Sequence, residues 1–517
     1  MTAQRNPQNA VGSAPTTADG QPTGKLDARS KHLAFGAIML VAVLSALDQS
    51  IVSTALPRIV QDLGGFNDLS WVVSAYLLAS TVTIPLYGKL SDLYGRRLLL
   101  VVAISVFLLG SALCGFATSM GQLIAFRGLQ GLGAGGLVPL AQAAIGDLYA
   151  PRERGRYQGY VASMWGIPAV AGPLVGGTLT QAISWRWIFY VNLPLGLVAL
   201  AVIVKTLAGT GSRAHQIDYA GAMVFGVSLG AILTACTWSG TTYPMTSAEV
   251  IGPFVAGVLG LVAFALIERH ASEPIVPLGM FRSRNLMASV GAFFVMGAVI
   301  FSITIYIPVY LQDVRGNTPI ICGATMISFS VPWAAAAILG GQLMTHSGRY
   351  RVFPIVGASL TTAGIAALVL LGDSSARTVI CVLLAVVGSG LGLTASPYLV
   401  GAQNVISRSE YGSAAAAMNL FRAIGGSLSV SVLGALLASR AQKVLTEQLG
   451  RRASNVNVAA LINGSVHGTI HDQRVIEGAL LSGLHAVYAV AAIVALVGVA
   501  FAIVLKEYPL TNEVAGG

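Results

Sequence analysis

Stretches of about 20 mostly apolar residues follow one another from residue 33 to residue 505. A helix of this length spans the hydrocarbon core of a bilayer, whereas membrane β-strands would alternate apolar and polar residues over about ten positions. We count fourteen stretches and predict an all-α membrane protein. They are 33–56, 69–89, 98–117, 121–147, 156–182, 186–206, 217–238, 248–267, 285–311, 319–344, 352–372, 377–404, 411–439 and 478–505.

The composition argues against a soluble globular protein. The chain of 517 residues is 55% hydrophobic and only 10% charged, whereas ordinary domains carry about 25% charged residues. Its net charge of +10 would suit a nucleic-acid partner, but the Lys and Arg residues fall mostly in alternate loops and form no single patch. This distribution marks the cytoplasmic side of a membrane protein, so we expect both termini in the cytoplasm and no nucleic-acid partner.

Two short motifs occur twice, about 250 residues apart. A half of six spans needs about 200 residues at this spacing, so the pair of stretches within 217–267 has no partner in the repeat. The repeat predicts the fold class of a two-bundle transporter whose binding site lies between its halves. The matching residues are Gly88, Leu90, Gly95 and Arg96 with Gly341, Leu343, Gly348 and Arg349, and Pro57, Gln61 and Asp62 with Pro308, Gln312 and Asp313.

The repeat and the polar ends divide the chain into parts. The first thirty residues are polar and rich in Pro, Thr and Gly, which predicts a disordered segment. The predicted parts are a cytoplasmic tail at 1–32, an N-terminal six-helix bundle at 33–206, an inserted two-helix hairpin at 207–270, a C-terminal six-helix bundle at 271–505 with a long outer loop at 440–477, and a cytoplasmic tail at 506–517.

The first and fourth stretches each carry a charged residue at a similar depth. Asp48 lies roughly 12 Å from the outer end of its stretch and Arg127 roughly 9 Å from the outer end of its own, at 1.5 Å per residue. An isolated charge at such depth is costly, so we expect the two to pair, with Gln130 one turn away in the same network. We predict that Asp48 binds the transported proton; a static structural ion pair is the alternative.

The loop between the second and third stretches predicts a cytoplasmic gate. Its two glycines permit a tight turn, and its arginines can pair with a carboxylate such as Asp92 or Asp147. We expect Asp92 near the start of the following helix, where the helix dipole favours a carboxylate. Simple positive-inside topology is the alternative to a charge latch. The predicted gating residues are Gly88, Asp92, Gly95, Arg96 and Arg97.

Further candidate residues lie inside the stretches. Gly172, Pro173, Gly176 and Gly177 predict a kinked pivot in the fifth helix, with a plain packing kink as the alternative. Arg422 has no carboxylate nearby in sequence, so it could contact an anionic substrate group or backbone carbonyls, or extend toward the cytoplasmic side. Candidate cavity residues are Gln130, Trp165, Tyr306, Tyr310, Trp333, Tyr398, Asn404, Asn419 and Arg422, although aromatic residues also form belts at the membrane surface.

These motifs together resemble the major facilitator superfamily, and specifically its fourteen-helix drug/proton antiporter family, over nearly all of residues 33–505. Two departures accompany the match: Pro168 stands where the fifth-helix motif usually has Gly, and we find no second carboxylate well inside a later stretch. The segments that carry the resemblance are Leu47–Pro57, Gly88–Arg97, Arg127 with Gln130, Gly131 and Gly133, Gly172 with Pro173, Gly176 and Gly177, and Trp185–Pro194.

The resemblance implies a proton-coupled antiporter that exports amphipathic or hydrophobic small molecules by alternating access. A narrow exporter of one endogenous metabolite, lipid or sugar is the alternative. We expect no enzyme activity, no cofactor beyond the proton gradient and no metal site, since two isolated histidines, His467 and His471, make a weak ligand set. The expected partners are the small-molecule substrate, protons and the lipid bilayer, and we expect a monomer in a bacterial inner membrane.

Overall fold

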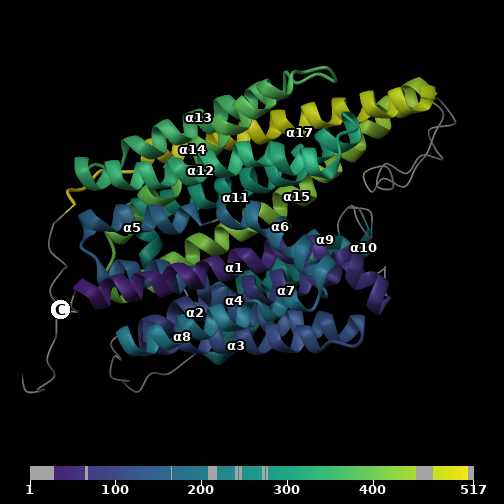
Figure 1. The fold of residues 1–517 in the computed structure, drawn as a ribbon. Coiled ribbons are helices and arrows are strands. Elements are labelled where there is room, and N and C mark those ends of the chain that lie inside the picture. The colour runs from purple at the N-terminus through teal and green to yellow at the C-terminus, as the bar shows by residue number, and fades with distance from the viewer. Residues whose placement is uncertain are drawn as a thin grey trace, which may run out of the picture.

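The computed structural model describes residues 28–64, 68–164, 166–207, 218–238, 243, 247–270, 274, 278–449 and 470–510. Over this part of the chain the regular elements are helices that run nearly parallel to one another (Figure 1). Most of the predicted tail at 1–32 lies outside the described residues, and so do Trp165, His467, residues 511–517 and the side chain of His471.

The first half of the chain forms one group of helices around a shared apolar core. Leu100, Phe107, Leu140 and Ile203 lie at the centre of this core and are at most 1% exposed. The helices are α1 (Ala28–Leu63), α2 (Leu69–Tyr94), α3 (Arg96–Phe116), α4 (Met120–Leu148), α5 (Pro151–Ser163), α6 (Gly166–Ala182), α7 (Trp187–Tyr190) and α8 (Asn192–Thr206).

The last part of the chain forms a second group, which lies above the first in Figure 1. Its core is a separate cluster of buried residues that includes Ile303, Leu384 and Val487. The elements are a 3-10 turn at Leu278–Arg282, α11 (Arg284–Val309), a π-helical turn at Tyr310–Val314, α12 (Pro319–Ser347), α13 (Val352–Leu368), α14 (Arg377–Gln403), a 3-10 turn at Arg408–Glu410, α15 (Tyr411–Leu449) and α17 (Ile470–Val504).

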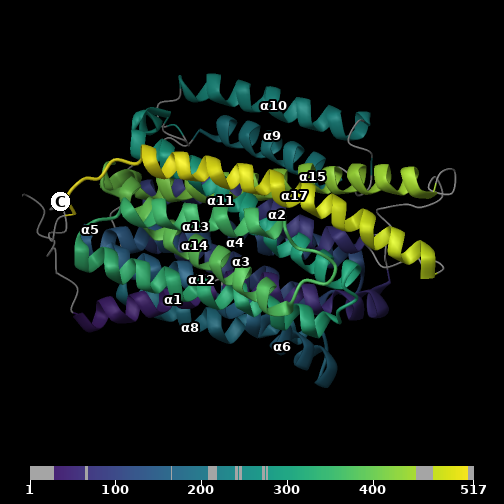
Figure 2. The ribbon, with the colours of Figure 1, turned by 90° about the horizontal axis from the view of Figure 1, so that it is seen from above.

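A two-helix hairpin stands beside the two groups, as the repeat predicts. It consists of α9 (Tyr219–Trp238) and α10 (Ala248–Glu268), and Figure 2 shows α10 on the outside. α9 touches both groups: the rings of Trp238 and Trp71 of α2 meet edge to face with centroids 6.3 Å apart, and the Ser431 hydroxyl of α15 donates to the carbonyl of Cys236 at 2.6 Å.

Eleven helices in the described part of the chain are long and apolar enough to cross a membrane, and two shorter apolar helices lie at Ala220–Cys236 and Val352–Leu368. Lipid supplies no hydrogen-bond partners, so such stretches satisfy their backbone internally as helices. The fold class is therefore confirmed. The predicted count of fourteen is not reproduced one for one, because the fifth stretch is divided.

The prediction of one continuous helix over 156–182 is wrong. α5 ends at Ser163 and α6 begins at Gly166, so the break lies just before Pro168. Pro168 has no N–H to donate to the carbonyl four residues earlier, and its ring would collide with that carbonyl. The departure noted in the fifth-helix motif thus separates two helices.

The predicted outer loop at 440–477 is shorter than expected. α15 continues to Leu449 and α17 already begins at Ile470. Ala441, Leu445 and Ala479 pack together and are at most 1% exposed, so the two helix extensions support each other. Residues 450–469 lie outside the described part of the chain.

Candidate functional site

A buried ion pair joins α1 and α4 in the middle of the first helix group. Arg127 Nη1 lies 2.7 Å from Asp48 Oδ2, and the two side chains are 1% and 0% exposed. Arg127 Nε also donates to the carbonyl of Val72, and its guanidinium lies 4.1 Å from the centroid of the Tyr76 ring. The structure therefore brings together the two charges whose depths agree in the sequence.

Three neutral side chains complete this polar centre. Gln130 Nε2 and Asn192 Nδ2 donate to Asp48 Oδ1 at 2.8 and 3.0 Å. The hydroxyl of Ser111 accepts from both amides, at 3.2 and 3.0 Å, and donates to the carbonyl of Phe189. Each of the three is completely buried. The carboxylate is thus held by donors from α4 and α8, and a buried charge with full hydrogen bonding is one that a protein can tolerate.

Glycines on α4 allow neighbouring helices to reach the polar centre. A Cβ at Gly131 would overlap the backbone of Tyr76, and one at Gly133 would overlap the backbone of Phe107. A Cβ at Gly110 of α3 would in turn collide with the backbone of Gln130. The glycine-rich segment after Arg127 is therefore a packing face, and it positions α2 and α3 around the ion pair.

The loop motif between α2 and α3 joins the two helix groups at the end that carries Ala28 and residues 505–510 (Figure 1). Asp92 Oδ1 accepts from the backbone N–H of Gly412 at 2.9 Å, and Oδ2 accepts from the N–H and the hydroxyl of Ser413 at 2.8 and 2.6 Å. The prediction that Asp92 serves the start of the following helix is wrong. Asp92 lies near the end of α2, and its carboxylate caps the start of α15 in the other group.

Arg96 connects this cap to a second carboxylate. It pairs with Asp92 and, through Nε at 3.0 Å, with Asp147 of α4. Arg408 of the other group pairs with Asp147 at 3.1 Å and donates to its carbonyl. Arg97 makes no ion pair or hydrogen bond within the described residues. Four of the predicted gating residues thus lie in one contact between the groups: Gly88 faces the backbone of Gly412, and Gly95 provides the turn with a φ of 90°.

The second copy of the motif lies in the second group and contacts a helix of the first group. The spacing that relates Gly88 to Gly341 places Thr345 at the position of Asp92. Thr345 Oγ1 accepts from the backbone N–H of Arg156 in α5 at 3.2 Å. Arg152 of α5 also donates to the carbonyls of Thr345 and His346 at the end of α12. A neutral hydroxyl therefore contacts the second turn of α5, whereas a carboxylate caps the start of α15.

The glycines of the fifth-helix motif allow α6 to lie close to α1. A Cβ at Gly172 would overlap the Ser50 side chain, whose hydroxyl donates to the carbonyl of Pro168 at 2.7 Å. Gly176 is buried, whereas a Cβ at Gly177 would meet nothing within 4 Å. Pro173 lies inside α6. The role of these residues as a kinked pivot stays a prediction, and the division between α5 and α6 falls before Pro168.

Four of the candidate cavity residues lie in the core of the second group. Tyr306, Tyr310, Trp333 and Tyr398 are 0–7% exposed and belong to the apolar core of the second group. Their polar atoms stay inside this group or at its loops: Tyr306 donates to the carbonyl of Val430 and Tyr310 to that of Gly372. Aromatic residues with a polar tip fill cores as readily as cavities, so their sequence pattern alone cannot separate the two.

The remaining cavity candidates divide between two places. Asn419 Nδ2 donates to Gln142 Oε1 of α4 at 2.6 Å and so bridges the two groups, and Arg422 is half-buried and donates to Asn419 at 3.3 Å. Asn404, by contrast, lies beyond the end of α14 and donates to the carbonyl of Pro509. Gln130 belongs to the polar centre.

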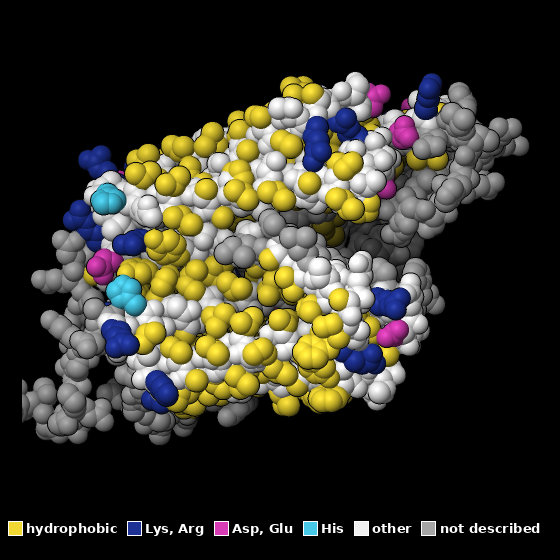
Figure 3. All heavy atoms as spheres, in the orientation of Figure 1, with side chains coloured by type: hydrophobic (Ala, Val, Ile, Leu, Met, Phe, Trp, Pro, Cys, Tyr) yellow, Lys and Arg dark blue, Asp and Glu magenta, His cyan; other side chains and the backbone are white. Residues whose placement is uncertain are grey.

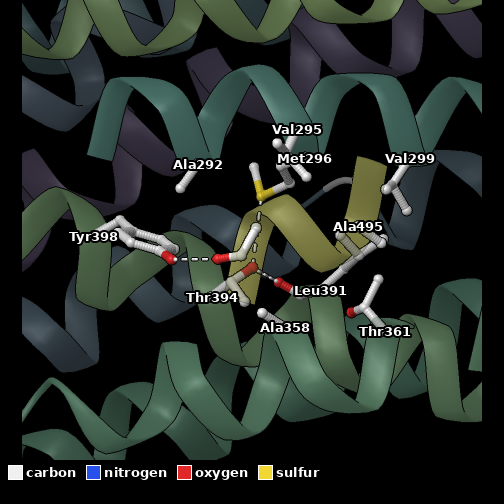
Figure 4. A pocket seen from close by; sticks show the side chains of 11 residues that line it. Ala292, Val295, Met296, Val299, Ala358, Thr361, Leu391, Thr394, Tyr398 and Ala495 are labelled. Carbon is white, nitrogen blue, oxygen red and sulfur yellow. Dashed lines mark hydrogen bonds between the residues drawn. The ribbon is translucent and has the colours of Figure 1, made fainter. Parts of the chain in front are cut away.

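A small cavity of about 30 Å³ lies inside the second group (Figure 4). It lies between α11, α13, α14 and α17, and its lining is apolar except for Thr361, Thr394 and Tyr398. Val299 of α11 also lines it, at the position that the 251-residue repeat assigns to Asp48. The second group therefore has an apolar space where the first has its polar centre.

The described residues contain no group of three or more His, Cys, Asp or Glu side chains placed to hold a metal ion. The surface of the helices is mostly apolar between two ends where charges gather, and it is hollowed between the two groups toward the end opposite the loop motif (Figure 3).

Sequence reasoning missed Asn192 and Ser111 as members of the polar centre. The only available signal was the position of Asn192 in the segment Trp185–Pro194.

Comparison with known proteins identifies the family. A model of the Major Facilitator Superfamily matches residues 38–430. The multidrug transporter protein MdtP of Bacillus subtilis (strain 168) is 32% identical over 508 residues, covering 92% of this chain and 93% of that protein. Multidrug resistance protein 3 of the same strain is 33% identical over 408 residues, covering 79% of each.

A solved structure supports the same fold. The human organic anion transporter MFSD10 (TETRAN) aligns with a TM-score of 0.59 over 90% of this chain and 99% of its own, at 13% sequence identity. At this identity the likeness concerns the fold alone. The match of the family model and the identity to full-length relatives show that this chain is a multi-pass membrane protein that belongs to the Major Facilitator Superfamily.

Proposed function

We propose that the protein exports amphipathic or hydrophobic small molecules in exchange for protons, with Asp48 as the proton-binding group. The observation that carries this proposal is the Asp48–Arg127 pair, which is at most 1% exposed and lies on two helices of the first group. Ionisable groups inside a membrane are costly and mark ion and proton pathways. The names of the relatives, a multidrug transporter and a multidrug resistance protein, support efflux as the direction.

The two helix groups supply the moving parts. Contacts such as Asp92 with Gly412 and Arg152 with His346 close the end that carries the loop motif, while the surface is hollowed between the groups toward the other end. We assign the closed end to the cytoplasm from its basic loops, so this conformation faces outward. The groups then rock about the site between them to reach the inward-facing state.

Protonation of Asp48 changes the balance between these states. A proton from outside neutralises the carboxylate and removes its ionic attraction to Arg127, which loosens α1 from α4 and favours the inward-facing state. Substrate binding from inside and release of the proton reverse the change. Arg127 also donates to Gln130 and to the carbonyl of Val72, so its charge retains acceptors when Asp48 is neutral.

The proton gradient supplies enough free energy for this exchange. One proton moving inward down 100 mV releases about 2.3 kcal/mol, and one pH unit adds about 1.4 kcal/mol. Their sum supports a substrate gradient of a few hundred-fold for one neutral molecule per proton.

The test compares Asp48→Asn with the wild type in proteoliposomes. We expect the variant to fold and insert, because an amide still accepts from Arg127, but to lose substrate-induced proton release and uptake driven by a pH gradient. Undiminished pH-driven transport by Asp48→Asn would refute the assignment. Susceptibility of cells to a panel of unrelated drugs decides breadth: resistance to one compound class alone would favour the narrow exporter.

A further inference from the structure

The two amide side chains around Asp48 differ in how firmly they are oriented. Gln130 Oε1 accepts from Arg127 Nη1 at 2.7 Å, so its carbonyl must face the guanidinium and its NH2 must face Asp48. Asn192 Oδ1 has no hydrogen-bond partner in the described part of the chain. Both N–H groups of Asn192 are used, toward Asp48 and toward Ser111. Only the orientation of Asn192 is therefore free to reverse.

The observed orientation suits a charged Asp48 only. A carboxylate accepts hydrogen bonds and repels a carbonyl oxygen, so Asn192 must present its NH2 to it. A protonated Asp48 instead carries an O–H that needs an acceptor. Arg127 at Asp48 Oδ2 and the NH2 of Gln130 at Asp48 Oδ1 are both donors, so neither can accept from this O–H. Asn192 is then the partner that can change from donor to acceptor.

We infer that Asn192 is a positioning residue that reverses its amide when Asp48 gains or loses its proton. A half-turn about the terminal torsion, which is broad for Asn, exchanges Oδ1 and Nδ2. Asn192 Oδ1 then accepts from the O–H on Asp48 Oδ1. The Ser111 hydroxyl can turn away from the Phe189 carbonyl and also donate to Asn192 Oδ1. The proton on Asp48 therefore resides on Oδ1, the oxygen away from Arg127. The inference rests on the proposed role of Asp48.

The position of Asn192 connects this reversal to α7 and, through α7, to α1. Asn192 is the first residue of α8 and follows α7 after a single residue. The Phe189 carbonyl of α7 loses a donor when Ser111 turns away. Phe189 and Trp185 lie in one buried apolar cluster with Ile51 of α1. Trp185 also donates to Asp62 at the end of α1. Protonation of Asp48 thus changes the hydrogen bonding of the turn that contacts the outer end of α1.

Charged or titratable groups from three neighbouring helices face Asp48. They are Arg127 from α4, Tyr76 from α2 and Cys114 from α3. The Cys114 thiol donates weakly to Gln130 Oε1, and the Tyr76 ring lies against the Arg127 guanidinium. Neither group supplies an acceptor that the structure places at Asp48 Oδ1.

The test is infrared spectroscopy of the purified full-length protein in liposomes, with the pH stepped from neutral to acidic. The band of the protonated Asp48 carboxyl is identified by its loss in Asp48→Asn. A carboxylic acid whose O–H donates a hydrogen bond absorbs at lower frequency than one without an acceptor. The decisive variants are Asn192→Thr and Asn192→Val, which have the same shape but differ in a hydroxyl that can donate or accept.

We expect the carboxyl band at higher frequency in Asn192→Val than in the wild type, and at an intermediate or wild-type position in Asn192→Thr. Asn285→Leu is the control. It removes another buried amide, one that bonds Lys506 and Tyr350 far from Asp48, and should leave the band unmoved. Equal bands in the Val and Thr variants would overturn the inference while leaving Asp48 as the proton site. A spectrum that Asp48→Asn does not change would instead refute the proposed function.

Discussion

The substitution Asp92→Asn tests whether the loop motif holds the two helix groups together. The Asp92 side chain is 4% exposed and accepts three hydrogen bonds from Gly412 and Ser413 at the start of α15. A carboxylate at a helix start contributes about 0.3–1 kcal/mol, and up to about 2 kcal/mol when partly buried. Asn keeps one acceptor but loses the charge and presents an NH2 to one of the donors.

The expected loss is therefore about 2 kcal/mol of contact free energy in the state that is closed at this end. Because every 1.4 kcal/mol is a factor of ten, the balance between closed and open states should shift by about 30-fold. The shift can be measured as a change in the distance distribution between spin labels at Glu153 of α5 and Arg349 after α12, both exposed.

Asp62→Asn is the matched control for this measurement. Asp62 also accepts from Trp185 and pairs with Arg186, but all three lie within the first group. Its loss should leave the label distances unchanged. A shift of less than about threefold in Asp92→Asn, or an equal shift in both variants, would show that the carboxylate does not hold the groups together.

Three further outcomes follow from the contacts. Thr345→Val removes a neutral hydrogen bond to Arg156, worth about 1 kcal/mol, so the same label distances should shift by only about fivefold; a larger effect than that of Asp92→Asn would contradict the ranking. Gly88→Ala places a Cβ 2.8 Å from the Gly412 carbonyl and should open this end without changing the charge; unchanged distances would show that the backbone adapts. Ala495→Val fills part of the cavity of about 30 Å³ and should raise thermal stability by about 1 kcal/mol, whereas a lower melting temperature would indicate overpacking.

The polar centre was only partly predictable from the sequence. Asp48 and Arg127 are recognisable because charged residues are rare in apolar stretches and their depths agree. Gln130 follows from helical spacing, one turn from Arg127. Ser111 and Asn192 could not be found in this way, because a serine or an asparagine in a membrane helix is common enough to carry no signal alone. Only the packing of α8 against α1, and of α3 against α4 and α8, gives them a role.

The loop between α2 and α3 was also only partly predictable from the sequence. The glycines and charges of the loop predict a contact at a helix terminus, and that contact exists. The sequence predicts a role for Asp92 at α3, the helix that follows it in the chain, whereas its carboxylate caps α15. The start of α15 is 320 residues away from Asp92 in the sequence, and the packing of the two groups brings them together.

The amino-acid sequence by itself determined that the chain forms membrane-crossing helices in two related halves with an added hairpin, because long apolar stretches in lipid must satisfy their own backbone and a repeated motif implies a repeated fold. The tertiary structure decided which polar groups meet. Pairs such as Asp48 with Asn192, or Asp92 with Ser413, join different helices, and their distances depend on how those helices pack and not on spacing along the chain.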